Sequence, residues 1–535
     1  MLFNQSGSIT HNDGDNLFYS LFLGSSGLTV TTGTVSIGST TAIGKVNIAL
    51  AAAQSWTNNS AGTLTIQNTV SNGAHLLTIG GTGNTLINGT IGNGSGGITK
   101  TGAGTLTLAG TNTYSGATTI SDGTLQVGNG GTTGTLGTGN VTNNSKLIIN
   151  RSNAITVSNL ISGTGSLTKS GTNTLTLSGA NTYSGETKIS AGALMVSNTL
   201  ALQSSTLNYT NNGGAIRFSS GITDYTLGGL AGDKNLALTN AGGTAVALTV
   251  GNNASNTTYG GELSAGGSLV KTGAGTLTLT GTNSYSGATT ISGGTLQVGS
   301  GGTSGTLGAG NVTNNSRLAF NRSDDITVNN RISGSGTLTK SGTNTLTLTA
   351  ASTYTNTTFV SSGRMVVNGS LQSHMITVAA GATLGGTGTV QAVTLDPGAF
   401  LAAGGDGQGT LTFTGEMILS GGSTNFMGIL SESLYDVVKG TGANSFTAAG
   451  SFVFDFTGNT TVTNGSTFAV LQNWNSIALS GATFSTKGLD AALSVDASKL
   501  ASDGIIKVIP EPTAISLIGL GGLLTLLSSR LRRRR

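Results

Sequence analysis

Residues 100–127 of the 535-residue chain read KTGAGTLTLAGTNTYSGATTISDGTLQV. The pattern returns three times, as KSGTNTLTLSGANTYSGETKISAGALMV at residues 169–196, KTGAGTLTLTGTNSYSGATTISGGTLQV at residues 271–298 and KSGTNTLTLTAASTYTNTTFVSSGRMVV at residues 340–367. Repetition at a fixed internal spacing indicates a repeat architecture, in which each copy packs against its neighbours.

Within one copy, apolar and polar residues alternate. Leu106 and Leu108 fall on one side of an extended strand, and Thr105 and Thr107 fall on the other. Short alternating runs bounded by Gly, Asn and Ser predict half-buried strands joined by turns. One copy therefore predicts about three short strands and three corners, roughly one coil of an all-β solenoid. Stacking such coils buries leucines that a single coil would leave exposed.

The copies are regularly spaced along the chain. The positions of Lys100 and Lys169 differ by 69 (169 − 100), and those of Lys271 and Lys340 differ by the same amount (340 − 271). At about 23 residues per coil, successive copies are predicted to lie about three coils, or about 14 Å, apart. On this arithmetic one edge of the solenoid carries Tyr114, Tyr183, Tyr285 and Tyr354. A larger duplication, with an offset of 171 (271 − 100) and no gap, relates residues 100–169 to residues 271–340.

The phrase GTLTLxGxNTYSGxTTIxxGTLQV resembles the autotransporter-associated β-strand repeat of bacterial passenger and surface proteins. The resemblance covers the four copies closely and the segments between them loosely. It implies a right-handed parallel β-helix and no particular chemistry. Members of that family serve as exported stalks, adhesins and matrix components, so the resemblance implies a structural or adhesive function.

The composition excludes several other classes of protein. The chain has 88 Gly, 3 Pro, no Cys and only 8% charged residues. The regular alternation of apolar residues argues against disorder, and the absence of Cys excludes disulfides and thiolate metal sites. The net charge of +4 depends on five arginines near the C-terminus, without which the balance is 18 − 19 = −1. A body so close to neutral predicts no nucleic-acid partner.

Four segments are predicted. Residues 1–96 form N-terminal coils, residues 97–369 the solenoid with the four copies, residues 370–509 further coils and a cap, and residues 510–535 a tail. The first basic residue is Lys45, so no basic region precedes an apolar run, and we expect the natural start to lie upstream. Phe452, Phe454 and Phe456 alternate before Trp474, which predicts a terminal segment closing the open end of the solenoid.

The tail differs in kind from the rest of the chain. Pro510, Glu511 and Pro512 precede the uncharged run TAISLIGLGGLLTLLSS at residues 513–529. A basic cluster follows, made of Arg530, Arg532, Arg533, Arg534 and Arg535. The uncharged run predicts a single transmembrane helix at the short limit of a membrane span, and the arginines place its C-terminal side in the cytoplasm.

The order of these three parts resembles the PEP-CTERM sorting signal. The resemblance implies export, temporary anchoring in the inner membrane and processing by an exosortase, a membrane protease-transpeptidase. The processed chain would then reach the cell surface or the extracellular matrix. The alternative interpretation of residues 510–535 is an ordinary single-span tail anchor.

The rival function is a membrane-anchored β-helical polysaccharide lyase or hydrolase, which needs clustered carboxylates or Ca²⁺ ligands. Asp324 and Asp325 are adjacent acids, but Asn153 and Ala154 replace them in the earlier block, so we interpret them as a solvated turn. The sequence GGDG at residues 404–407 occurs once, and the histidines His11, His75 and His374 lack metal-ligand spacing. We therefore predict no catalytic residue, no metal and no cofactor.

The repeated tyrosines, together with Asn112, Asn181 and Asn283, carry two interpretations. One is a surface edge that binds an exopolysaccharide or a cell-surface glycan through aromatic faces. The other is a corner closed by each tyrosine, with each asparagine satisfying backbone groups of a turn. Ser352 replaces the asparagine in the fourth copy, which favours the corner. Two partners are expected from the tail, an exosortase and the inner membrane. A glycan is the expected partner only if the tyrosine edge binds sugar.

Overall fold

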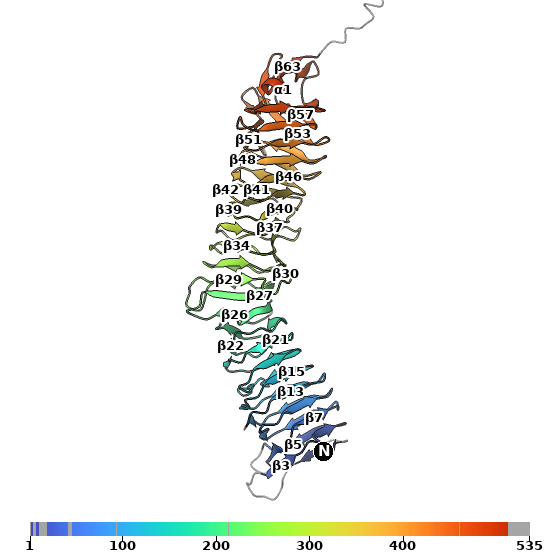
Figure 1. The fold of residues 1–535 in the computed structure, drawn as a ribbon, viewed down its shortest axis with the longest axis vertical. Coiled ribbons are helices and arrows are strands. Elements are labelled where there is room, and N and C mark those ends of the chain that lie inside the picture. Colours follow the sequence, from blue (N-terminus) through green and yellow to red (C-terminus); the bar gives the residue numbers. More distant parts are fainter. Residues whose placement is uncertain are drawn as a thin grey trace, which may run out of the picture. The chain divides into compact units, whose positions relative to one another are not determined.

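The structure is a computed structural model, and it describes residues 2–3, 7–9, 19–40, 45–92, 94–211, 213–405, 407–459 and 461–511. Two compact units divide the chain. The first consists of residues 1–325, 329–344 and 353–356, and the second of residues 326–328, 345–352 and 357–535. In each unit, short strands stack as successive rungs (Figure 1).

The alternation seen in the sequence sets which side chains are buried. In β14 (Thr105–Leu108) the two leucines are fully buried and the threonines are half-exposed. This strand pairs in parallel with β16 (Thr124–Val127), which pairs with β18 (Lys146–Ile149) in the next coil. Leucine therefore lies above leucine along the core. The predicted all-β parallel solenoid is confirmed.

Three faces build the first unit. Face A contains β1 (Leu2–Phe3), β4 (Leu28–Val30), β7 (Gln54–Asn58), β10 (Leu77–Gly80), β13 (Ile98–Lys100), β15 (Thr118–Ile120), β17 (Val141–Asn143) and β20 (Ile161–Ser162). Face B contains β2 (Gly7–Ile9), β5 (Val35–Ile37), β8 (Leu64–Ile66), β11 (Thr85–Ile87), β14, β16, β18, β21 (Ser166–Lys169), β23 (Thr187–Ile189) and β25 (Leu202–Tyr209).

Face C lies between them in chain order. It contains β3 (Tyr19–Leu23), β6 (Val46–Leu50), β9 (Val70–Ser71) and β12 (Ile91–Gly92). Further along come β19 (Ile155–Val157), β22 (Thr174–Leu177), β24 (Ala193–Val196) and β26 (Ala215–Phe218), and then β28 (Leu236–Ala237) and β31 (Leu263–Ser264). The ladder ends at β26 and resumes at β28.

The long strand β27 (Asp224–Gly232) turns a corner and joins two ladders. One continues through β29 (Ala247–Val250), β32 (Ser268–Lys271), β34 (Thr289–Ile291), β36 (Val312–Asn314) and β39 (Ile332–Ser333). The other continues through β30 (Thr257–Tyr259), β33 (Thr276–Leu279), β35 (Thr295–Val298), β37 (Arg317–Phe320) and β40 (Thr337–Lys340).

The second unit also has three parallel ladders. The first is β38 (Ile326–Val328), β41 (Thr345–Leu348), β44 (Arg364–Val367), β47 (Thr383–Gly386), β50 (Phe400–Ala403), β53 (Thr424–Ser431), β57 (Ser451–Asp455) and β61 (Thr483–Lys487). The second is β42 (Ala351–Ser352), β45 (Ser370–Leu371), β48 (Thr389–Val390), β51 (Thr410–Phe413), β55 (Val437–Lys439) and β59 (Leu471–Gln472). The third is β43 (Thr358–Val360), β46 (Met375–Val378), β49 (Ala392–Leu395), β52 (Met417–Leu419), β56 (Ser445–Ala448) and β60 (Ser476–Ala478).

Antiparallel pairing marks the last part of the second unit. β54 (Leu434–Tyr435) folds back on β53, and β63 (Ile505–Pro510) lies between β58 (Thr467–Ala469) and β62 (Leu493–Asp496). The short helix α1 (Leu500–Asp503) precedes β63. Phe452, Phe454 and Phe468 are fully buried here, so aromatic side chains fill the core where the coils end.

The predicted register of the four copies is wrong. The paired strands β13, β15, β17 and β20 begin at positions 98, 118, 141 and 161, so three coils advance the numbering by 63 (161 − 98) and not by 69. The six extra residues carry the chain around one more corner. As a result, β21 of the second copy lies in the ladder of β14, and Lys169 stands in line with Leu108. The third and fourth copies show the same displacement, from β33 to β40.

This displacement also corrects the expected tyrosine edge. Tyr114 lies at the corner between β14 and β15, whereas Tyr183 lies at the corner between β22 and β23. Because β14 and β22 belong to different ladders, successive tyrosines sit at different corners. The coil length varies with the corners, and the extra residues of the longer coil between β15 and β17 lie in loops.

Candidate functional site

The repeated tyrosines are buried. Tyr114, Tyr183, Tyr285 and Tyr354 are at most 1% exposed. Three of the hydroxyl groups lie 2.6–2.7 Å from the hydroxyl of the threonine four residues later: Thr118, Thr187 and Thr289. Burial raises the pKa of Tyr183 to about 12, so its hydroxyl stays protonated. A surface edge of tyrosine rings is therefore wrong, because the rings fill corners of the core.

The repeated asparagines join one coil to the next. Asn112 Oδ1 accepts a hydrogen bond from Ile91 N at 2.8 Å, and its Nδ2 donates to Thr135 O at 2.6 Å. Asn283 makes the equivalent bonds to Leu263 N and Thr306 O, at 2.8 and 2.6 Å. Each amide thus satisfies backbone groups of the coils before and after it, which is the corner interpretation.

A feature that the sequence analysis missed is a set of buried lysines. Lys100, Lys169, Lys271 and Lys340 begin the four copies and are at most 2% exposed. Lys271 Nζ donates to the carbonyls of Thr272, Gly273 and Gly293 at 2.6–3.0 Å. These carbonyls belong to the corners of two successive coils. The position of each lysine in the alternation could have indicated its burial. Each lysine stands where the alternating strand has its buried residues, as in Ile98-Thr99-Lys100.

Burial sets the ionisation of these lysines. It lowers the pKa of Lys169, Lys271 and Lys340 to about 8, because charge is costly away from water. The pKa of Lys100 is also lowered by burial, and the charge of Asp122 opposes this. The carbonyl acceptors hold the ammonium group in place, so we interpret these lysines as links between corners.

Two buried arginines close a loop in each block. Arg151 donates to the carbonyls of Gly134 and Thr132, and Arg322 donates to those of Gly305 and Thr303, at 2.5–2.7 Å. Asn153 accepts from Arg151 as Asp324 accepts from Arg322. The side-chain bonds from Arg322 hold the pKa of Asp324 below its ordinary value. The acidic residue singled out by the sequence is thus engaged in a loop contact.

No group of three or more His, Asp or Glu residues able to hold a metal occurs among the described residues. His11 and Asp406 lie outside them. Asp436 accepts backbone hydrogen bonds from Gly409 and Gly428 at 3.0 and 2.8 Å, and Arg364 donates to Gly405 O. Burial raises the pKa of Asp436 to about 6. The two backbone hydrogen bonds to Asp436 show that its carboxylate holds turns of the backbone in place.

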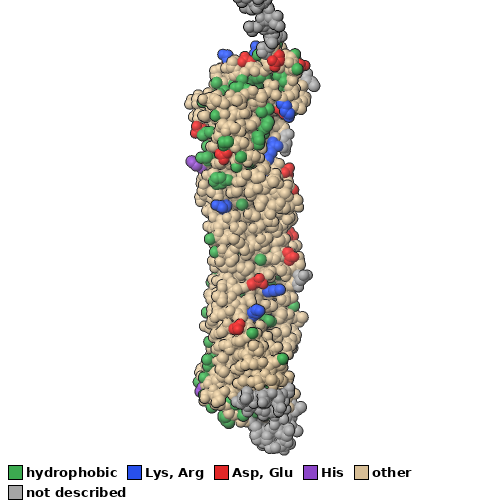
Figure 2. Space-filling view, turned by 90° about the vertical axis from the view of Figure 1, so that its right-hand side faces the viewer, with side chains coloured by type: hydrophobic (Ala, Val, Ile, Leu, Met, Phe, Trp, Pro, Cys, Tyr) green, Lys and Arg blue, Asp and Glu red, His purple; other side chains and the backbone are tan. Residues whose placement is uncertain are grey.

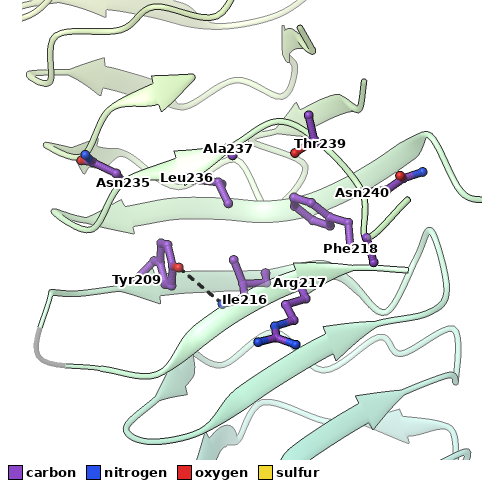
Figure 3. A pocket seen from close by; sticks show the side chains of 10 residues that line it. Tyr209, Ile216, Arg217, Phe218, Asn235, Leu236, Ala237, Thr239 and Asn240 are labelled. Atoms are coloured by element: carbon purple, nitrogen blue, oxygen red, sulfur yellow. Dashed lines mark hydrogen bonds between the residues drawn. The ribbon is translucent and has the colours of Figure 1, made fainter. Parts of the chain in front are cut away.

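A hollow of about 470 Å³ opens where the ladder of face C is interrupted between β26 and β28. Figure 3 shows Ile216 and Phe218 of β26 facing Leu236 and its neighbours in the next coil. The amide of Asn240 is already bonded to Ile222 O, Gly242 N and Thr244 N. This amide is thus used within the fold, and the hollow is a local opening of the stack.

The outer surface carries few charges. Figure 2 shows one face of the molecule, on which scattered acidic and basic side chains interrupt a large area of uncharged polar side chains and backbone. The chain as a whole has 8% charged residues. Contacts with a partner would therefore depend on hydroxyl and amide groups.

Little of the tail lies within the described residues. Pro510 ends β63, opposite Leu493, and Glu511 N donates to Ala492 O at 2.8 Å. Pro512, the uncharged run and the five arginines lie outside the described residues. Among the residues that are described, no helix is long and apolar enough to cross a membrane.

The fold and the corner contacts define a parallel β-solenoid whose repeated corners are closed by hydrogen bonds from side chains to the backbone. Residues 98–127, 167–196, 269–298 and 338–367 match the passenger-associated-transport-repeat family, so the predicted repeat is confirmed. A stretch of 107 residues is 50% identical to the adhesin BmaC autotransporter of Brucella suis biovar 1 (strain 1330). This match covers 19% of the chain and 3% of that adhesin, so the chain spans a small part of its relative's length.

Proposed function

We propose that this chain is an exported, non-enzymatic solenoid that acts as a structural or adhesive element at the bacterial surface or in the extracellular matrix. The observation that carries the proposal is that the repeated polar side chains make their hydrogen bonds inside the fold. The tyrosines, asparagines and lysines of the copies bond to corners of the fold. The repeated residues therefore build the scaffold itself. The match to an adhesin and the sparsely charged surface support the same function.

The test is done in the native host, with the natural upstream sequence in place. Intact cells are treated with an added protease and probed with an antibody against residues 97–509. We expect the antigen to be lost from intact cells, and we expect a deletion strain to attach less to surfaces. Antigen that survives until the cells are lysed, together with unchanged attachment, would contradict the proposal.

We further propose that residues 510–535 are a sorting signal that an exosortase processes. Prolines on both sides of Glu511 disfavour a helix there, and an extended segment suits a protease groove. Replacing Glu511 and Pro512 by alanine should leave the chain in the inner membrane at full length, while Pro510 and β63 stay intact. Fractionation and size measure the outcome. If the Glu511→Ala/Pro512→Ala variant is processed like the wild type, residues 510–535 are a membrane anchor and not a sorting signal.

The enzyme alternative has its own test. Purified chain is incubated with acidic and neutral polysaccharides, with and without Ca²⁺, and new reducing ends are measured. We expect no turnover. The Asp324 carboxylate accepts hydrogen bonds from Arg322, and we assign it no catalytic role. Turnover that is lost in the Asp324→Ala variant would therefore favour a lyase or hydrolase.

A further inference from the structure

Face A carries an uninterrupted column of hydroxyl side chains. Strand register places Ser55 beside Thr78, and then Thr99, Thr119, Thr142 and Ser162 one rung further each time. These residues alternate with buried core residues, so they point outward. Rungs of a sheet are about 4.8 Å apart, so the five steps span about 24 Å.

Five of the six hydroxyl groups in this column are available, and the sixth, that of Ser162, donates to Val141 O at 3.3 Å. Those of Ser55, Thr78, Thr99, Thr119 and Thr142 make no hydrogen bond to any residue that the structure describes. The threonines are half-exposed, and Ser55 is exposed. Each threonine therefore presents one free hydroxyl and one methyl group at every rung.

The flanking positions on the same side of the sheet are uncharged. The residues two positions earlier on each rung are Ala53, Leu76, Gly97, Ala117, Asn140 and Leu160. Those two positions later are Thr57, Gly80, Thr101, Ser121, Asn144 and Thr164. Such a face offers no cation to phosphate groups, and it lacks the aromatic and arginine anchors typical of protein interfaces. It does fit a ligand that repeats hydroxyl groups and C–H faces along a line.

The duplicated block provides an internal comparison. The corresponding column holds Thr226, Thr249, Val270, Thr290, Thr313 and Ser333. Val270 interrupts it in the middle, opposite Thr249 on one side and Thr290 on the other. Both columns thus run along parallel rungs, but they differ in the continuity of the hydroxyl groups.

We propose that the column from Ser55 to Ser162 binds a linear, neutral polysaccharide that lies along the solenoid axis. One sugar residue of an extended β-linked chain is close in length to one rung, so successive sugars meet successive hydroxyl groups. The inference rests on the proposed adhesive function and deepens it by naming the class of ligand and the face that binds it.

The test measures binding of the full chain to hexamers of β-1,4-glucan, β-1,4-mannan and β-1,3-glucan, and to their shorter oligomers, by calorimetry. We expect one site per chain for at least one of them, with affinity that rises with oligomer length up to about five or six sugars, the span of the column. Replacing Thr99, Thr119 and Thr142 by valine should weaken this binding at least tenfold. Valine keeps the branched shape that strands favour, so the fold is retained.

Two matched variants complete the test. Thr290→Val/Thr313→Val changes the interrupted column and should leave binding unchanged, whereas Val270→Thr should create a second site per chain. Binding to none of the hexamers, or an equal loss in both sets of valine variants, would overturn the inference. Shaping of ice crystals by the wild-type chain, lost in the triple variant, would reassign the column to ice. Surface exposure on cells is measured separately, so failure of the ligand leaves the proposed function standing.

Discussion

At the scale of single residues, the corners depend on buried polar groups whose partners are also buried. Tyr285 and Thr289 are fully buried, and their hydroxyl groups lie 2.6 Å apart. A buried hydroxyl that loses its partner keeps the cost of desolvation without the compensating bond. Removing one hydroxyl of the pair should therefore destabilise the fold more than the net contribution of their hydrogen bond.

Tyr285→Phe should lower the free energy of unfolding by about 1–3 kcal/mol, because Thr289 loses its partner. The double variant Tyr285→Phe/Thr289→Val should recover part of this loss, since no unpaired hydroxyl remains. Denaturant unfolding of the wild type and three variants, including Thr289→Val alone, measures the coupling. Fully additive effects would contradict a direct bond.

The buried lysines predict how stability depends on pH. The pKa of Lys169, Lys271 and Lys340 falls from 10.5 to about 8 on folding. Between these values the folded chain binds fewer protons than the unfolded chain, so the free energy of unfolding should rise with pH, by up to about 1.4 kcal/mol per lysine and pH unit. Urea unfolding at several pH values measures this slope.

The control for the pH dependence is a chain with methionine at positions 169, 271 and 340, which should lack the rise. An identical slope in both chains would assign the effect to other groups. A wild-type slope of opposite sign would mean that the carbonyl acceptors hold the protonated form more strongly than burial disfavours it.

At the scale of the strand, the side of the sheet decides the effect of a substitution. Leu277 is 1% exposed and stacks on Leu296 in the next coil, whereas its neighbour Thr276 is half-exposed. Leu277→Asp places an unpaired charge in the core and should cost about 3–5 kcal/mol. Thr276→Asp is the control and should cost far less. Thermal unfolding of both variants measures the difference, and equal melting points would mean that the leucine side is not buried.

The sequence predicted these strands well because alternation is a local property. Leu106 and Leu108 are buried as expected, and the copies match a known repeat. The register between copies could not be predicted, because it depends on corner lengths that vary from one coil to the next. The role of Lys271 was missed because lysine is usually exposed, and only its position in phase with buried residues indicated otherwise.

At the scale of the whole chain, residues that are 171 positions apart in the two blocks lie on the same face of the solenoid. Eight rungs lead from Val127 to Val298 along one ladder. Deleting residues 128–298 joins strand ends that are equivalent in the fold. The shortened chain should therefore fold, with a β-type circular dichroism spectrum and a cooperative melt.

Deletion of residues 128–196, which removes a single interval between copies, is the matched control. It joins the end of β16 to the residue after β24, and these strands belong to different ladders. We expect this chain to misfold or to melt at a much lower temperature. If both deletions fold equally well, the displacement between copies has no consequence for packing.

The buried position of the four lysines also affects digestion. Trypsin-like proteases cleave after lysine and arginine and need several neighbouring residues in an open, extended form. Lys100, Lys169, Lys271 and Lys340, with Arg151 and Arg322, are at most 7% exposed and are tied to backbone carbonyls. The stretches around Lys100 and Lys271, which lie between Lys45 and Lys146 and between Lys234 and Arg317, therefore offer such enzymes no accessible bond without local unfolding, in keeping with the surface location proposed above.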